Sequence, residues 1–127
     1  MTAERERPHL PRAAEIDSYG KGGFRFAGMS HRGSLVCLPD GIWPCAVQRP
    51  QDVDEASLAL IFAATPALDL CVIGTGRDPW ILPRGLKARF AERGIAVETM
   101  ATGPAVMTYN ILLGERRRVA ALLIAAE

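Results

Sequence analysis

The first 47 residues alternate between short segments with strand character and clusters of turn-forming residues. Four segments have the strand pattern: residues 15–19, 24–26, 34–38 and 42–47. Pro39-Asp40-Gly41 is a strong turn signal between the last two, and residues 28–33 are interpreted as further turns. Pro44 restricts its segment to a sheet edge or a strand end, because proline cannot donate a ladder hydrogen bond. This region therefore predicts antiparallel strands joined by short turns.

From residue 52 onward the apolar positions recur at helical spacing, with apolar runs between them. The predicted helices cover residues 53–64, 83–94 and 102–114, and the predicted strands cover 68–73, 95–99 and 118–125. Asp52 and Glu55 have the spacing of a capping box at the start of the first helix. Pro83 and Gly94 suit the start and the end of the second helix. Thr102 or Gly103 can cap the third.

This alternation of helix and strand predicts an α/β fold in which helices pack on a sheet, with right-handed crossovers between parallel strands. Beyond Arg118 the last strand is apolar on both faces, which predicts a central position in the sheet. The length of 127 residues fits one domain, predicted over 13–127. Residues 1–12 carry mixed charge and two prolines, and are expected to form a disordered tail.

The charge balance excludes some partners. Fifteen basic and fourteen acidic residues give a net charge of +1, too little to attract nucleic acid or an anionic membrane. No apolar run approaches the roughly 20 residues of a membrane helix, and the charged N-terminus does not resemble a signal peptide. We therefore expect a cytoplasmic protein without direct membrane insertion.

Cysteine and histidine are too few and too irregularly spaced for a metal centre. The three cysteines form no CxxC pair, and the two histidines add no zinc spacing. Cys37 and Cys71 lie in apolar runs, where thiols are inert, and no base can be assigned to Cys45. We expect reduced thiols, no metal and no cofactor.

Two loops follow predicted strands and could form one rim of the sheet. Gly74-Thr75-Gly76-Arg77 follows the 68–73 strand, and Thr102-Gly103-Pro104 follows the 95–99 strand and opens a helix. If these strands are parallel neighbours, the loops face each other where ligands bind in such sheets. Free N–H groups at the helix start, with Arg77, could hold an anion or a carboxylate. The alternative is structural, with glycines for a tight turn and Thr102 as a cap.

The Thr108-Tyr109-Asn110 triplet also admits two interpretations. A tyrosine hydroxyl can act as an acid or base, and Asn110 can polarise a carbonyl or contact a ligand. However, Tyr109 shares a helical face with Ala105 and Leu112, which favours a packing role with its hydroxyl on a backbone partner. For Asn110 both readings stay open.

Three apolar loop or strand-end residues are candidate contacts for a protein partner. Trp80 and Ile81 follow Asp78-Pro79 in a loop, and Trp43 precedes Pro44. Aromatic residues near a rim can anchor an interface. They can equally form a lid on the core.

The ordered set of residues resembles a known family of small proteins. It comprises Tyr19, Gly22, Phe24, Trp43-Pro44, Gly74-Thr75-Gly76, Thr102, Ala105, Thr108-Tyr109-Asn110, Glu115 and Arg117-Arg118-Val119-Ala120-Ala121-Leu122. The family includes a mitochondrial assembly factor of respiratory complex I and an adipogenesis-associated protein, and many bacterial members are known only as a domain of unknown function. The resemblance implies a three-layer α/β fold with a mixed sheet and an accessory role without established enzymatic activity. Bacterial members are often associated with protein-export or membrane-biogenesis genes.

Two positions depart from the family pattern. The family usually has a basic residue where this chain has Met107, and a glycine where it has Arg116. The loss of a basic residue at 107 weakens an anion-binding role for the rim, unless Arg77 or Arg117 replaces it.

Three functional hypotheses follow. The leading one is an assembly or accessory protein, monomeric or weakly self-associating, that binds protein components of membrane complexes or export machinery. The second is a small-ligand or anion-binding module at the rim of residues 74–77 and 102–104. The third is an enzyme that uses Thr102, Tyr109 and Asn110, although no complete catalytic set is visible.

Overall fold

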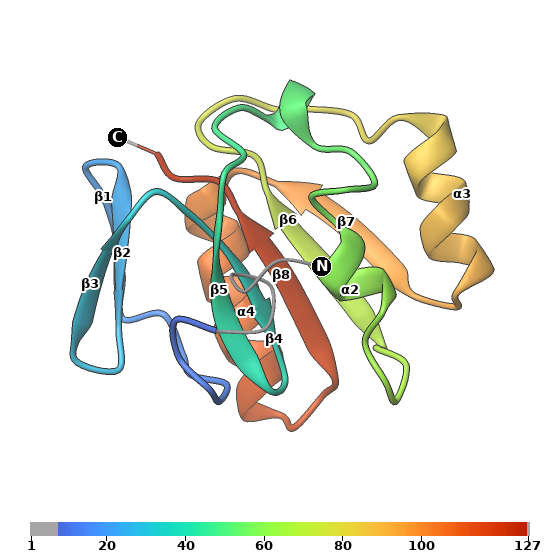
Figure 1. Ribbon diagram of the computed structural model, residues 1–127. Coiled ribbons are helices and arrows are strands. Elements are labelled where there is room, and N and C mark those ends of the chain that lie inside the picture. Colours follow the sequence, from blue (N-terminus) through green and yellow to red (C-terminus); the bar gives the residue numbers. More distant parts are fainter. Residues whose placement is uncertain (1–7, 127) are drawn as a thin grey trace.

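Two β-sheets organise the computed structural model, which describes residues 8–126 (Figure 1). The smaller sheet is antiparallel and contains β1 (Ser18–Gly20), β2 (Gly23–Phe26) and β3 (Met29–Arg32). The larger sheet has the order β5-β4-β8-β6-β7. Its strands are β4 (Ser34–Leu38), β5 (Gly41–Cys45), β6 (Leu70–Gly74), β7 (Ala96–Met100) and β8 (Val119–Leu123). This sheet is mixed, because β5-β4-β8 pair antiparallel and β8-β6-β7 pair parallel.

Helices cover both faces of the larger sheet and give the fold three layers. The helical segments are η1 (Pro50–Asp52), α2 (Ala59–Phe62), α3 (Arg84–Glu92) and α4 (Thr102–Gly114). One core cluster joins the sheet to α2 and α3, and a second joins it to α4 and the smaller sheet. Figure 1 shows the smaller sheet and α3 at opposite ends of the molecule, with α4 behind the larger sheet. The predicted three-layer α/β fold with antiparallel N-terminal strands is confirmed.

Strand β8 is central, as its apolar sequence predicts. All five of its residues are buried. Ala120 and Leu122 pack into the cluster with α2 and α3, whereas Ala121 and Leu123 pack into the cluster with α4. Successive side chains of a strand point to opposite faces, so a strand covered on both sides needs apolar residues at every position.

The helix predicted over 53–64 is mostly wrong. Only Ala59–Phe62 is α-helical, and residues 55–58 form a turn before it. The N-cap of α2 is Leu58, without a side-chain cap, and a reciprocal pair of hydrogen bonds joins Asp54 and Ser57 instead of Asp52 and Glu55. The Ser57 N–H donates to Asp54 Oδ1 (2.9 Å), and the Asp54 N–H donates to Ser57 Oγ (3.0 Å). Side chains of this kind compete with the helix for backbone groups, which delays the helix by several residues.

Residues 9 and 10 pair with the edge strand β5. His9 and Leu10 N–H groups both donate to Ile42 O, and the Ile42 N–H donates to Leu10 O (2.9 Å). The exposed edge of β5 offers hydrogen-bond partners to these two residues. The disordered tail over residues 1–12 stays a prediction, and residues 1–7 of it lie outside the described residues. Residues 29–32 form β3 rather than turns.

Helix α4 ends in two hydrogen bonds that define a Schellman motif. The Arg116 N–H donates to Leu113 O (3.0 Å), and the Arg117 N–H donates to Leu112 O (3.1 Å). Arg116 has a φ of 63°, in the left-handed region that favours glycine. This conformation gives a physical reason why glycine suits the position, where the chain departs from the pattern of the family that it resembles.

Candidate functional site

The two predicted rim loops do lie side by side. Strands β6 and β7 are parallel neighbours, with Gly74 opposite Met100 at their carboxyl ends. The Thr75 N–H continues the ladder by donating to Met100 O (2.8 Å). The loops 74–77 and 102–104 therefore share one edge of the sheet, as their sequence positions predict.

Hydrogen bonds join these loops directly to each other. The Thr102 N–H donates to Gly76 O (2.9 Å), and the Gly76 N–H donates to Thr102 Oγ1 (2.9 Å). The same hydroxyl donates to Ile124 O (2.7 Å) at the end of β8. Thr102 is completely buried and ties three segments together. It is the first residue of α4 rather than its cap, which is Ala101.

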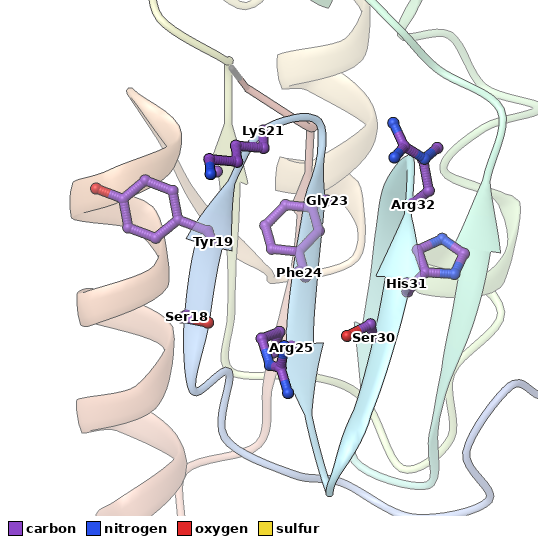
Figure 2. Close-up of a pocket in the computed structure, with 10 residues that line it drawn as sticks. Ser18, Tyr19, Lys21, Gly23, Phe24, Arg25, Ser30, His31 and Arg32 are labelled. Carbon is purple, nitrogen blue, oxygen red and sulfur yellow. The ribbon is translucent and has the colours of Figure 1, made fainter.

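The two glycines of this junction allow close packing. A Cβ at Gly74 would lie 3.1 Å from Ala105 Cβ and from Thr102 Oγ1, so a side chain there would require α4 to move a few tenths of an ångström away from β6. A Cβ at Gly103 would collide with the hydroxyl of Tyr19, which reaches across from β1. Figure 2 shows the Tyr19 ring extending from its strand toward α4. Gly103 is therefore a packing position for Tyr19.

Part of the predicted rim borders a hollow. Thr75, Gly76 and Arg77 line a cavity of about 520 Å³ together with residues 48–51 and 124–126. The Thr75 hydroxyl donates to Asp78 O (2.7 Å), whereas Arg77 is exposed and has no ion pair within residues 8–126. Thr102 and Gly103 do not border this hollow. The structure thus separates the predicted ligand residues into a loop that lines a cavity and a helix start that holds the fold.

Asn110 uses its amide on the protein backbone. Its Oδ1 accepts from the Ile16 N–H, and its Nδ2 donates to Ile16 O, both at 2.9 Å. These two hydrogen bonds resemble the pair that two opposite residues form between antiparallel strands. They anchor the segment before β1 to α4. Asn110 lies two helical turns from Thr102, away from the rim hollow.

Tyr109 is a core residue. Its side chain is completely buried, and its hydroxyl donates to Ala14 O (3.4 Å). Burial, followed by the neighbouring Cys37 thiol, raises the pKa of Tyr109 far above its ordinary value. The packing role that its helical face predicts is the one that the structure shows.

The thiols are held protonated by their surroundings. Burial raises the pKa of Cys37 to about 12 and raises that of Cys71 further, and it also raises the pKa of the half-buried Cys45. In the part of the chain that the structure describes, no three His, Cys, Asp or Glu residues are placed to hold a metal ion.

The predicted interface residues differ in their accessibility. Trp43 is only 8% exposed and packs in the core cluster with α2 and α3, so its burial corrects the expectation of an exposed anchor. Trp80 is half-buried against the same cluster. Ile81 is 89% exposed, the accessible apolar side chain that this prediction requires.

Sequence reasoning missed a second apolar surface. Met107 is 65% exposed and Ile111 is 58% exposed. Gly103, Met107 and Ile111 are four residues apart along α4, so they lie on one side of the helix. The exposed ring of Tyr19 packs on Gly103. We call Tyr19, Met107 and Ile111 the α4 surface. Its signal in the sequence is the absence of any charged residue from 102 to 114, which is unusual for a helix with a solvent-facing side.

Comparison with protein families identifies the chain. Residues 16–124 match the model of a family described as protein of unknown function (DUF498/DUF598). The chain belongs to the DUF498/DUF598 family. The matched range covers both sheets and α4, and so includes every site residue discussed above.

Relatives of this DUF498/DUF598 chain include an assembly factor and structures from two bacteria. It is 36% identical over 115 residues to the mouse protein named NADH dehydrogenase (ubiquinone) 1 alpha subcomplex assembly factor 3. That match covers 91% of this chain but 62% of the mouse protein, so the chain spans less than two thirds of that relative. A crystal structure of an outer membrane protein from Bartonella henselae has 44% identity and a TM-score of 0.89, over 94% of this chain and all of that one. The NMR structure of a Rhodopseudomonas palustris protein has 53% identity and a TM-score of 0.81, over 98% and 93% of the two chains.

None of the helices formed by residues 8–126 is long and apolar enough to cross a lipid bilayer.

Proposed function

We propose that this protein is a cytoplasmic assembly or accessory factor that binds a protein component of a membrane complex. The first candidate for that complex is the respiratory NADH dehydrogenase, and export machinery is the second. The mouse relative named as an assembly factor of NADH dehydrogenase motivates the first candidate. The Bartonella relative, described as an outer membrane protein, is consistent with a role connected to membranes.

The α4 surface is the observation that carries this proposal. Met107 and Ile111 expose apolar side chains on a helix without charged residues, and the Tyr19 ring extends the same surface. Aromatic residues and methionine are enriched in the cores of protein interfaces, and charged residues are depleted there. The polar groups of the same region, on Thr102, Tyr109 and Asn110, are bonded within the protein. This arrangement favours binding of a partner over catalysis.

The proposal is tested by affinity purification of the full chain from gently solubilised membranes of cells that encode it. Subunits recovered with the wild-type protein are quantified and compared with those recovered with Ile111→Glu. The carboxylate at an exposed position leaves stability nearly unchanged but places an unpaired charge in the interface. Lys87→Glu is the matched control, because it introduces the same carboxylate at an exposed position of α3.

We expect respiratory or export subunits with the wild-type and Lys87→Glu proteins, and strongly reduced amounts with Ile111→Glu. Ile81→Glu tests whether the partner instead binds the loop of Trp80 and Ile81, which the sequence also predicts as a contact. If Ile81→Glu abolishes recovery and Ile111→Glu does not, the interface lies on the loop. Recovery of no respiratory or export subunit with any of these proteins contradicts the proposed function.

A second candidate function is binding of a small ligand or anion at the rim. The hollow of about 520 Å³ beside Arg77 supports it, since its size is typical of small-molecule sites. Asp78 also lines this hollow and opposes an anion there. A thermal-shift series with small anions and carboxylates tests this candidate, because a bound ligand raises the melting temperature. If a ligand raises the melting temperature of Arg77→Gln as much as that of the wild type, Arg77 does not bind it and the candidate loses its support.

A further inference from the structure

The outer face of the smaller sheet contains a hollow whose charged residues are all basic. The hollow has a volume of about 480 Å³ and is lined by Lys21, Arg25 and Arg32, the hydroxyls of Ser18 and Ser30, and Tyr19, among others. Figure 2 shows these side chains arranged over the three strands. Among the described residues no acidic side chain lines this hollow. We call it the sheet hollow.

The strand register explains its shape. Arg25 on β2 lies between Ser18 on β1 and Ser30 on β3 in one cross-strand row. Two residues further along, Gly20 and Gly23 lie beside Arg32 in the next row of the same face. The face is open at Gly20, where a Cβ would have no atom within 4 Å, whereas a Cβ at Gly23 would collide with the backbone of His31.

The cations of the sheet hollow have no counter-ions in the described part of the protein. None of Lys21, Arg25 and Arg32 takes part in an ion pair there. The guanidinium of Arg32 lies 4.0 Å from the position of a Cβ at Gly22, so it folds over the turn that carries Lys21. The register pairs Arg25 with two serines and Arg32 with Gly23, so neither lies directly opposite another cation. The three cations border one hollow without a charge of opposite sign, and a bound anion would supply it.

The remaining groups specify the kind of anion. Guanidinium groups bind phosphate through paired hydrogen bonds, and serine hydroxyls add donors beside them. His31 also borders the hollow, but burial lowers its pKa and its Nε2 lies 3.3 Å from Ser34 O, so it adds no charge at neutral pH. Tyr19 also borders the hollow, but it pairs with the buried Phe24 in the register and its ring packs on Gly103 of α4. The volume exceeds that of one phosphate and falls within the range of small-molecule sites.

We propose that the sheet hollow binds the phosphate of an organic phosphate monoester through Lys21, Arg25 and Arg32. This function is separate from the assembly role of the α4 surface. The monoester is either a free metabolite or the headgroup of a lipid such as phosphatidic acid. The binding chemistry is the same for both.

The test follows backbone amide signals of the full-length protein by NMR during titration with phenyl phosphate at constant ionic strength. We expect saturable shifts confined to residues 18–32, and weaker shifts with inorganic phosphate, which fills less of the hollow. Arg25→Gln and Arg32→Gln should each weaken binding about tenfold, the loss of one charge-assisted contact. Arg84→Gln removes an exposed charge on α3 and should leave binding unchanged.

Sedimentation with vesicles of phosphatidylcholine, with and without phosphatidic acid, separates the two sources. Arginine-dependent sedimentation with phosphatidic acid identifies a lipid headgroup, and its absence together with phenyl phosphate binding identifies a free ligand. The proposal is overturned if shifts do not saturate, if they centre on residues 74–77, or if Arg84→Gln weakens binding as much as Arg25→Gln. Tighter binding of a glutamate-rich peptide than of phenyl phosphate at the same residues also overturns it, in favour of a protein partner.

Discussion

Asn110 holds Ile16 by both backbone groups. Its side-chain amide accepts from the Ile16 N–H and donates to Ile16 O, each at 2.9 Å, although 94 residues separate the two in sequence. Ile16 is buried in the core cluster of α4, so water cannot readily replace these bonds. One helical side chain therefore fixes the position at which the N-terminal segment enters the smaller sheet, which carries Tyr19 and the sheet hollow.

Asn110→Ala should lower the free energy of unfolding by about 2 to 3 kcal/mol, because it leaves a donor and an acceptor of Ile16 unpaired in a part-buried site. Urea unfolding followed by circular dichroism measures the change. Gln51→Ala, which removes an exposed amide, serves as the control and should be nearly neutral. An unchanged stability for Asn110→Ala would show that its amide is not a structural clamp.

Thr102→Val should destabilise the protein by about 2 kcal/mol or more, because the isosteric side chain removes a buried hydroxyl bonded to both Gly76 and Ile124. Thr102→Ser keeps both bonds and loses one methyl group, so it should cost about 1 kcal/mol. The same unfolding experiment compares the two. If serine is the more harmful substitution, packing rather than the hydroxyl junction holds the rim.

Stability should decline in alkaline solution because of the buried thiols. Burial raises the folded-state pKa of Cys37 from 9.0 to about 12, so above pH 9 the unfolded chain releases a proton that the folded chain keeps. The stabilisation is complete below the unfolded-state pKa and is lost as the pH rises through the folded-state value. The slope should reach about 1.4 kcal/mol per pH unit for each such thiol.

Unfolding with reductant across this range measures the slope. Cys37→Ala should reduce it by the contribution of one thiol, whatever its effect on stability at neutral pH. A slope that is identical in Cys37→Ala and wild type would contradict the assignment to this residue.

Arg116→Gly should leave stability unchanged or raise it by up to about 1 kcal/mol, because a left-handed φ costs arginine more than glycine. Substitution by glycine inside a helix does the opposite. Thermal unfolding of this variant beside Arg117→Gly, whose φ is not positive, separates the two effects. Equal destabilisation by both substitutions would rule out strain at Arg116.

Local patterns in the sequence predicted the parts of the fold that depend on neighbours along the chain. The central position of β8 follows from its uninterrupted apolar run, and the adjacent rim loops follow from the parallel crossover. The late start of α2 was missed because an Asp54–Ser57 turn and a capping box use the same residue types. The pairing of Leu10 with Ile42 depends on an exposed strand edge that only the assembled sheet provides.

In the candidate site, too, local patterns are predictable from the sequence and long-range contacts are not. The glycines and threonines of the rim are recognisable in sequence, but their mutual hydrogen bonds are not, because Thr102 reaches Ile124 only through the packing of α4. The sheet hollow escaped prediction because residues 28–33 were interpreted as turns, which left Arg32 outside any strand. Once β3 is in place, the register brings Arg25 and Arg32 to one face.

The amount of assembled NADH dehydrogenase in cells that lack this protein tests the central claim most directly. Membranes are separated on native gels, and the enzyme is quantified after complementation with wild-type, Ile111→Glu or Lys87→Glu protein. The account predicts that the assembled enzyme is reduced without the protein, restored by wild type and Lys87→Glu, and not restored by an equally abundant Ile111→Glu. An unchanged amount of enzyme in cells without the protein, or full restoration by Ile111→Glu, would contradict it.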